Sequence, residues 1–342
     1  MDADIAHPVA PGLNPDEIAH RFVQYRHESA DPLWNFRLLM DHTSHVEGRP
    51  QAIQLGGPPV SLALLRRSNP PCGLEVLGHW LSAEVHPADW LDLWLAVGRI
   101  KPVSARYVRM PAGAVGDVVG TWTADDLQWV GRFFCLKTGP RLFLLRFSAL
   151  AADYPIVADD FFVSIASFSA AEQASSPFAE EVRWVEQAAP LRCRVAVPVS
   201  WEVTMESSED PLSAFHADLI SPGVDGPATV ARLSFGLTGP DHMPGHQEAF
   251  DDAMEAVRGA GVAVSPNPPE REAHLPPFSE SWLSISPAQL NDQKTQVRCR
   301  VLRHPAAWIV ALVICIDAQT SPWGWMRAKR ALDIATSFIE FA

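Results

Sequence analysis

A pair of unusually apolar β-hairpins constrains the fold more than any other feature of the sequence. The first, VGRFFCLKTGPRLFLLRF, covers residues 130–147, and the second, VRCRVLRHPAAWIVALVICI, covers residues 297–316. In each, an alternating strand with basic residues leads through a two-residue turn into a very apolar strand. A helical pattern that ends near a Phe follows both hairpins. The sequence therefore predicts the same hairpin-and-helix unit twice.

The spacing between matched positions indicates a repeat that is larger than the hairpin. Trp90 and Phe250, in two helical patterns that precede the hairpins, are 160 residues apart. Arg132 and Arg298, in the hairpins themselves, are 166 residues apart, and the separation is 170 residues at the closing helices. A separation that rises slowly is expected of a duplicated domain with loop insertions. Two unrelated α+β domains are the alternative.

The length and the order of elements predict two domains. A chain of 342 residues exceeds the usual size of a single hydrophobic core. We expect an α+β protein of two tandem α/β/α sandwich domains, each an antiparallel sheet with flanking helices. The first would cover residues 1–170, with an N-terminal helix capped by Asn14, and the second residues 191–342. Residues 171–190 are small and polar and are expected to be a linker.

Charge, cysteine content and hydropathy exclude several classes of protein. The net charge is −13 and only 4 of the 27 basic residues are Lys, which argues against nucleic acid as a partner. The five Cys show no CxxC spacing and are expected to be buried thiols in a reducing compartment. The longest apolar run has 11 residues, whereas a membrane-spanning helix needs about 20. With no signal-peptide pattern at the N-terminus, we expect a cytoplasmic protein.

Motifs of known catalytic sites are absent from the sequence. It contains no GxSxG, HExxH, Walker or GxGxxG pattern, so we expect neither an enzyme nor a cofactor. Two histidine pairs, His42 with His45 and His242 with His246, have spacings that could ligate a metal. Both pairs lie in polar loop patterns, and we expect histidines without a bound metal. An enzyme or small-ligand protein that uses these loops is kept as an alternative.

The hairpin strands carry apolar residues on both faces, which raises the question of what covers them. Helices on both sides of a sheet would explain such strands. Alternatively, part of one face is open and binds an apolar client. The predicted client contacts, taken as the even-numbered face of each hairpin, are Phe134, Leu142, Leu144, Trp308, Val310 and Leu312. The predicted rim of this surface consists of Arg132, Arg146, Arg298 and Arg300.

The order of elements in the second half resembles a known family. AVPVSWEV at residues 196–203 is followed by two strands, a helix, a strand, the hairpin and a closing helix. This order is similar to the PsbP-like α/β/α sandwich, whose members include photosystem extrinsic subunits, Ran-binding Mog-type proteins and Eag-type chaperones of type VI secretion effectors. The resemblance covers residues 190–342 best and about 30–170 more loosely. Pro198 and Trp201 belong to this signature, which is one of fold.

The resemblance to the bacterial Eag-type chaperones implies a function. Those proteins are cytosolic and act as dimers that shield apolar segments of an effector before export, and two fused copies would form a pseudo-dimer within one chain. We therefore expect a non-enzymatic cytoplasmic adaptor or chaperone that binds an apolar client segment or secretion effector on its sheet faces. A structural subunit of a larger protein assembly, with the same faces permanently covered, is the main alternative.

Overall fold

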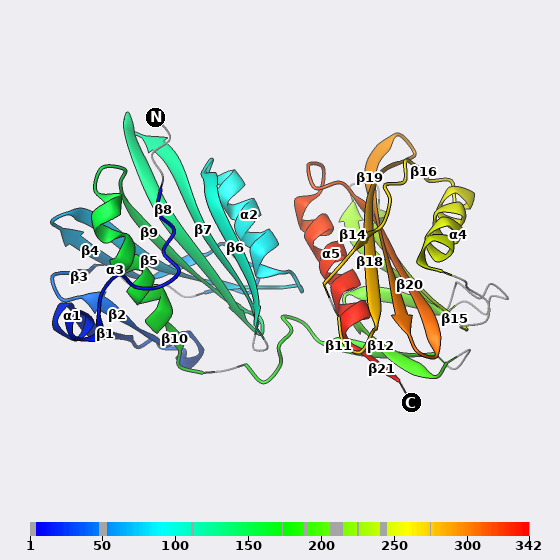
Figure 1. The fold of residues 1–342 in the computed structure, drawn as a ribbon, viewed down its shortest axis with the longest axis horizontal. Coiled ribbons are helices and arrows are strands. Elements are labelled where there is room, and N and C mark those ends of the chain that lie inside the picture. Colours follow the sequence, from blue (N-terminus) through cyan, green and yellow to red (C-terminus); the bar gives the residue numbers. More distant parts are fainter. Residues whose placement is uncertain are drawn as a thin grey trace. The chain divides into compact units, whose positions relative to one another are not determined.

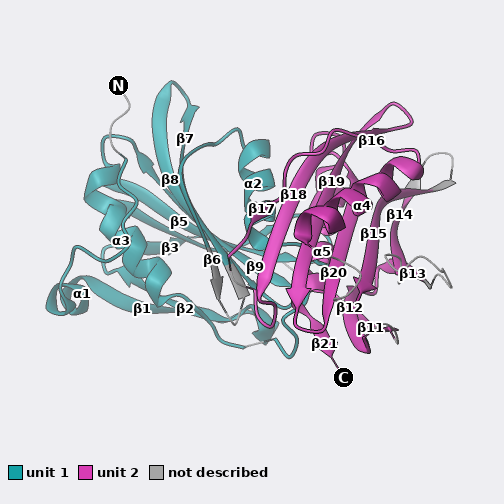
Figure 2. Cartoon of the chain, turned by 45° about the vertical axis from the view of Figure 1, so that its right-hand side comes forward, with its two compact units in different colours: residues 1–179 teal, residues 180–342 magenta. Residues whose placement is uncertain are grey.

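The computed structural model describes most of the chain, namely residues 5–47, 53–110, 113–172, 174–187, 191–205, 215–223, 226–239, 245–273 and 275–341. The chain divides into two compact units, unit 1 over Met1–Ala179 and unit 2 over Glu180–Ala342 (Figure 2). The division falls inside the segment 171–190 that was expected to be a linker.

Unit 1 contains a seven-stranded sheet and a three-stranded sheet, both antiparallel. Its helices are α1 (Pro15–Arg21), η1 (Pro32–Trp34, a 3-10 turn), α2 (Pro87–Val97) and α3 (Tyr154–Ser167). Its strands are β1 (Phe22–His27), β2 (Phe36–Asp41), β3 (His45–Glu47), β4 (Val60–Ser68), β5 (Pro71–Trp80), β6 (Lys101–Met110), β7 (Gly113–Ala124), β8 (Leu127–Thr138), β9 (Arg141–Leu150) and β10 (Ser169–Ala170). The large sheet has the order β3-β4-β5-β9-β8-β7-β6, and the small sheet has the order β1-β2-β10.

Both faces of the large sheet of unit 1 pack against other elements (Figure 1). On one face, α3 packs together with the small sheet, and the rings of Phe161 in α3 and Phe147 in β9 have centroids 4.5 Å apart. On the other face, α2 lies over β6, β7 and β8, and the ring centroids of Trp94 and Phe133 are 5.7 Å apart. The apolar residues on both faces of the first hairpin thus have partners within unit 1.

Local sequence signals account for the ends of several elements. The predicted cap at Asn14 is confirmed, because its side chain accepts a hydrogen bond from the backbone of Glu17 at 2.9 Å and the Glu17 carboxylate accepts one in return. Pro15 occupies the first turn of α1, where a missing N–H has no consequence. Gly139, in the turn between β8 and β9, has a positive φ of 59° that favours glycine.

Unit 2 also contains one large and one small antiparallel sheet. Its helices are α4 (His246–Gly259) and α5 (Pro322–Ser337). Its strands are β11 (Val182–Gln187), β12 (Cys193–Pro198), β13 (Trp201–Met205), β14 (Phe215–Gly223), β15 (Gly226–Thr238), β16 (Ala263–Val264), β17 (Glu270–Arg271), β18 (Glu280–Leu290), β19 (Gln293–His304), β20 (Ala307–Ile316) and β21 (Ile339–Phe341). The large sheet has the order β13-β14-β15-β20-β19-β18-β16, with β17 also paired to β18, and the small sheet has the order β11-β12-β21.

The two units share one strand order. Each large sheet begins with three consecutive strands, continues with the three strands of the hairpin region in reverse, and ends on the strand that follows the first helix of the unit after η1 or β15. In each unit a helix follows the hairpin, and the strand after that helix joins the small sheet. The prediction of an α+β chain built on antiparallel sheets is confirmed.

The segment expected to be a plain linker contains regular structure. Residues Val182–Gln187 form β11, which pairs with β12 at the edge of the small sheet of unit 2. Upstream of β11, the backbone carbonyl of Pro177 accepts a hydrogen bond from Lys137 Nζ at 3.1 Å. The strand escaped prediction because most of its side chains are exposed or half-buried, so its apolar signal is weak.

Candidate functional site

The pairing of the hairpin strands differs from the face assignment made from the sequence. Each hairpin turns through two residues, so that His304 pairs with Ala307 in the second hairpin and Val301 with Val310. A two-residue turn pairs each residue with one three positions along at the turn, and therefore joins odd to even positions across the hairpin. The assignment of even positions in both strands to one face was wrong, and the turn length would have corrected it.

The predicted client contacts of unit 2 lie beneath a helix. Trp308, Val310 and Leu312 are 7%, 5% and 6% exposed and belong to one apolar cluster with Phe250 and Met254 of α4. The matching strand β19 contributes to the same cluster on this face. These three side chains therefore pack against the protein's own helix in the described structure.

The predicted client contacts of unit 1 do not share a face. Phe134 pairs with Leu145, and both belong to the cluster on the α3 side of the large sheet. Leu142 and Leu144 are fully buried and alternate with Leu145 along β9, so they point to the α2 side. Phe134 is half-buried against the α3-side cluster. The three residues therefore form no common surface.

Three of the four predicted rim arginines are buried. Arg132 is 1% exposed and donates to both carboxylate oxygens of Asp117, at 2.9 and 2.7 Å. Arg298 is also buried and lies over the Trp325 ring, 5.5 Å from its centroid. Arg146 is the exception, since it is half-exposed and forms an ion pair with a glutamate of β5 at 2.7 Å. The arginines thus join elements of the fold and do not surround an open face.

The fourth arginine, Arg300, is the centre of a buried charge cluster. Its Nε and Nη2 donate to the two carboxylate oxygens of Glu272, at 2.8 and 2.9 Å. Its Nη1 donates to Asp333 at 3.0 Å and to the Thr336 hydroxyl at 2.7 Å, both in α5. Burial opposes the charged form, but the carboxylates of Asp333 and Glu272 outweigh it and raise the pKa of Arg300. The cluster ties β19 to α5.

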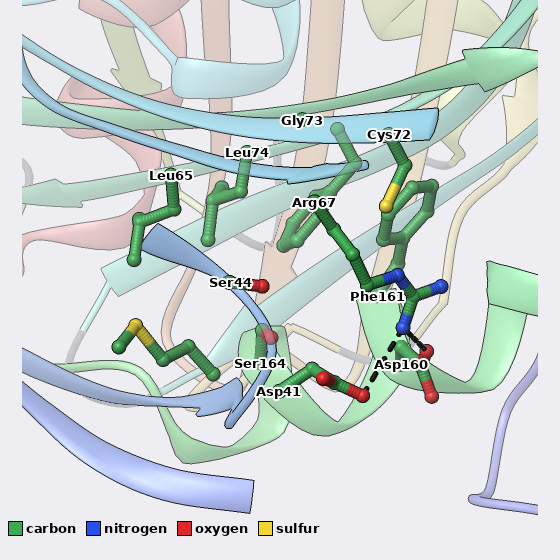
Figure 3. A pocket seen from close by; sticks show the side chains of 12 residues that line it. Asp41, Ser44, Leu65, Arg67, Cys72, Gly73, Leu74, Asp160, Phe161 and Ser164 are labelled. Carbon is green, nitrogen blue, oxygen red and sulfur yellow. Dashed lines mark hydrogen bonds and ion pairs between the residues drawn. The ribbon is translucent and has the colours of Figure 1, made fainter. Parts of the chain in front are cut away.

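A small cavity in unit 1 also contains buried charges (Figure 3). Arg67 Nη1 lies 2.7 Å from Asp160 and 3.1 Å from Asp41, and the thiol of Cys72 lines the same space. The cavity measures about 30 Å³, enough for roughly one water molecule. Burial raises the pKa of Cys72, although Arg67 acts in the opposite direction. A thiol that stays protonated near neutral pH is a poor nucleophile, so this arrangement favours an internal ion-pair network.

The histidines that could have ligated a metal lie apart. His42 accepts or donates a 2.9 Å hydrogen bond with a backbone carbonyl at the end of α1, and so serves as a donor there. His45 pairs with the Glu47 carboxylate at 2.9 Å, and His246 stacks on a tryptophan ring of β18. His242 lies outside the described residues. Within the described ranges, no group of three or more His, Cys, Asp or Glu side chains is arranged to hold a metal ion.

The outer edge of β6 is a surface that sequence reasoning missed. In the described part of the chain, the only backbone partner of this ten-residue strand is β7. Val103 and Tyr107 on β6 are 46% and 48% exposed, and the Tyr107 hydroxyl donates to Asp92 of α2 at 2.7 Å. The sequence predicted a strand at 103–109, but nothing local to it indicated that the strand ends the sheet.

Comparisons with known proteins give structural similarities at low identity. No family model matches the chain, and no curated protein matches it. A cyanobacterial PsbP (CyanoP) structure from Synechocystis is 10% identical with a TM-score of 0.32, covering 48% of this chain and 98% of that one. The Ran-binding protein Mog1p from Saccharomyces cerevisiae is also 10% identical with a TM-score of 0.32, covering 47% and 96%.

A longer structure matches across both units. The immunity protein TplEi of T6SS from Pseudomonas aeruginosa is 8% identical with a TM-score of 0.24, covering 94% of this chain and 97% of that one. Together the matches support a resemblance to PsbP-like folds and identify no family. Among the helices described, none is long and apolar enough to cross a membrane.

Proposed function

We propose that this chain is a non-enzymatic protein-binding adaptor whose unit 1 receives an extended segment of another protein as an added strand beside β6. One observation carries the proposal, namely the uncovered edge of β6. An edge strand presents a row of backbone N–H and C=O groups that can pair with another chain. Strand addition of this kind uses main-chain hydrogen bonds for affinity and side chains for specificity.

The matching edge of unit 2 is built differently, which strengthens the proposal. There the strand position is divided between β16 and β17, two residues each, with residues 265–269 between them. Short and interrupted edge strands are a common protection against pairing with other chains. In β6 only the start carries protective residues, Lys101 and Pro102, followed by a register shift before Ser104. The remainder of β6 is a continuous edge.

Exposed apolar side chains accompany this edge. Val103 and Tyr107 lie on β6, and Val97 at the end of α2 is 77% exposed. An added strand would cover part of the Val103 and Tyr107 side chains, and burial of apolar surface provides most of the favourable free energy in protein association. The client expected from the sequence is therefore placed at the β6 edge, because the sheet-face residues that were first assigned to it pack against α2, α3 and α4.

A site-specific photo-cross-linker tests the proposal in native cells. The cross-linking amino acid replaces Tyr107 in the full chain, and the matched control carries it at Glu270, an exposed position of β17 in the equivalent edge of unit 2. We expect one defined segment of another protein to be cross-linked at Tyr107, and no such product at Glu270. Mass spectrometry of the cross-linked peptide identifies the segment.

A blocking variant gives the quantitative arm of the test. Val103→Lys with Tyr107→Lys places charges along the edge, and Lys at position 107 can still pair with Asp92. Loss of two half-buried apolar contacts of about 1 kcal/mol each should weaken binding of the identified segment roughly 30-fold. Unchanged binding, equal cross-linking at both positions, or cross-linking to a second copy of this chain alone would refute strand addition by a partner.

A further inference from the structure

The segment before α1, residues 5–13, occupies a groove of unit 1. Figure 1 shows it in dark blue, crossing over the large sheet beside α3. It has no regular secondary structure, and its contacts reach β6, β7 and the first residue of α3. The groove thus lies on the α3 side of the sheet, whereas the proposed client strand uses the outer edge of β6.

Three consecutive carbonyl groups of this segment are held by side chains of the groove. Arg106 of β6 donates to the carbonyls of His7 and Pro8, the latter at 3.1 Å. Tyr154, the first residue of α3, donates its hydroxyl to the carbonyl of Ala6 at 3.0 Å. Recognition of main-chain groups in this way fixes an extended peptide without regard to most of its side chains.

The groove also has a receptor for one imidazole. The His7 side chain is 4% exposed, with Nδ1 2.8 Å from the Ser104 hydroxyl and Nε2 3.1 Å from an Asp117 carboxylate oxygen. Arg132 holds this carboxylate from the other side. Burial opposes ionisation of Asp117, but His7 and Arg132 more than offset it and lower the pKa of the carboxyl.

The remaining residues of the segment are loosely held. Beyond Pro8, residues 9–12 are exposed, and Val9 is 75% exposed. Pro8 favours an extended conformation of His7, which suits the groove. Segments with few buried contacts open with small free energies, so the anchoring at residues 6–8 decides whether the groove is occupied.

We infer that the groove between α3 and strands β6 and β7 is a binding site for an extended peptide that contains His followed by Pro. Residues 5–13 fill it in cis, and a His-Pro segment of another protein replaces them. The position of unit 2 that corresponds to Asp117 is Leu283, since each pairs with the matching residue of the next strand, so the imidazole receptor is a feature of unit 1. This site is separate from the β6 edge and goes beyond the proposed function.

The test uses the full chain and a synthetic peptide of residues 2–13, DADIAHPVAPGL, labelled with fluorescein. His7→Ala removes the imidazole anchor of the cis segment and leaves the groove intact. We expect fluorescence anisotropy to show binding to this variant roughly tenfold tighter or more than to the unsubstituted chain, because the cis segment no longer competes. A control peptide with Ala in place of His should bind at least tenfold more weakly.

Two further variants keep the test decisive. Asp117→Asn and Arg106→Gln, each in the His7→Ala chain, should weaken peptide binding, and circular dichroism establishes that each variant is folded. Val103→Lys with Tyr107→Lys should leave peptide binding unchanged, which separates this site from the β6 edge. If the folded His7→Ala chain fails to bind the peptide, binds both peptides equally, or exchanges its segment only with a second copy, the inference is wrong.

Discussion

Removal of the Arg300 side chain should destabilise unit 2 far more than removal of an exposed arginine on the same strand. Arg300 makes four hydrogen bonds, to Glu272, Asp333 and Thr336. Arg303 lies three residues further along β19, is 56% exposed in its side chain, and contacts Glu280 at 3.4 Å. Arg300→Leu and Arg303→Leu therefore compare a buried and an exposed ion pair in one strand.

The magnitude follows from what each substitution leaves behind. Without Arg300, the carboxylate of Asp333 remains buried without its guanidinium partner, whereas Glu272 is open enough to be hydrated. Breaking a buried pair on one side costs about 3–5 kcal/mol, and loss of an exposed pair costs about 1 kcal/mol or less. Arg300→Leu with Asp333→Leu should recover at least half of the loss, because the buried charge is then absent.

Accessibility of Cys299 gives a readout that is specific to unit 2. This thiol is fully buried beside Arg300, and burial raises its pKa to about 12, so it is alkylated only when the unit opens. The urea concentration at half-labelling, read by mass spectrometry, gives the free energy of unfolding for each variant. A shift of less than about 1 kcal/mol for Arg300→Leu would refute the argument, as would a double variant no more stable than the single one.

Other substitutions and conditions test the same structure. Trp308→Ser and Leu312→Ser were expected from the sequence to abolish client binding in a folded protein; beneath α4 they should each destabilise unit 2 by about 3 kcal/mol, and urea unfolding at wild-type stability would contradict this. For Asp41, burial opposes ionisation but Thr43, Arg67 and Arg21 lower the pKa, and the pKa of Asp117 is lowered as well. Both carboxylates stabilise unit 1 above their unfolded pKa of about 3.9, and this stability is lost as the pH falls through their lower folded values. Urea midpoints should therefore decrease in acid, with a smaller decrease in Asp117→Asn. Cys72 should be alkylated slowly at neutral pH and faster in alkali, because burial raises the pKa of its thiol; a rate independent of pH would contradict this.

Local patterns carried the prediction of elements further than the prediction of surfaces. The two hairpins, the cap at Asn14 and the helix after each hairpin could be predicted, because alternation, turn residues and capping side chains act over a few residues. The pairing across each hairpin was also within reach, since a two-residue turn fixes it. The strand Val182–Gln187 was missed because it lies at a sheet edge with little apolar contrast.

The sequence by itself determined which segments become strands and helices and in what order they recur, since these depend on neighbouring residues. Tertiary structure alone decided which strand faces are covered, because contacts between α4 and Trp308 or between Arg300 and α5 join segments distant in the chain. It also decided that β6 ends its sheet and that His7 lies against Asp117, about 110 residues away. An apolar strand pattern is the same beneath a helix and beneath a client, and packing between distant elements selects one of them.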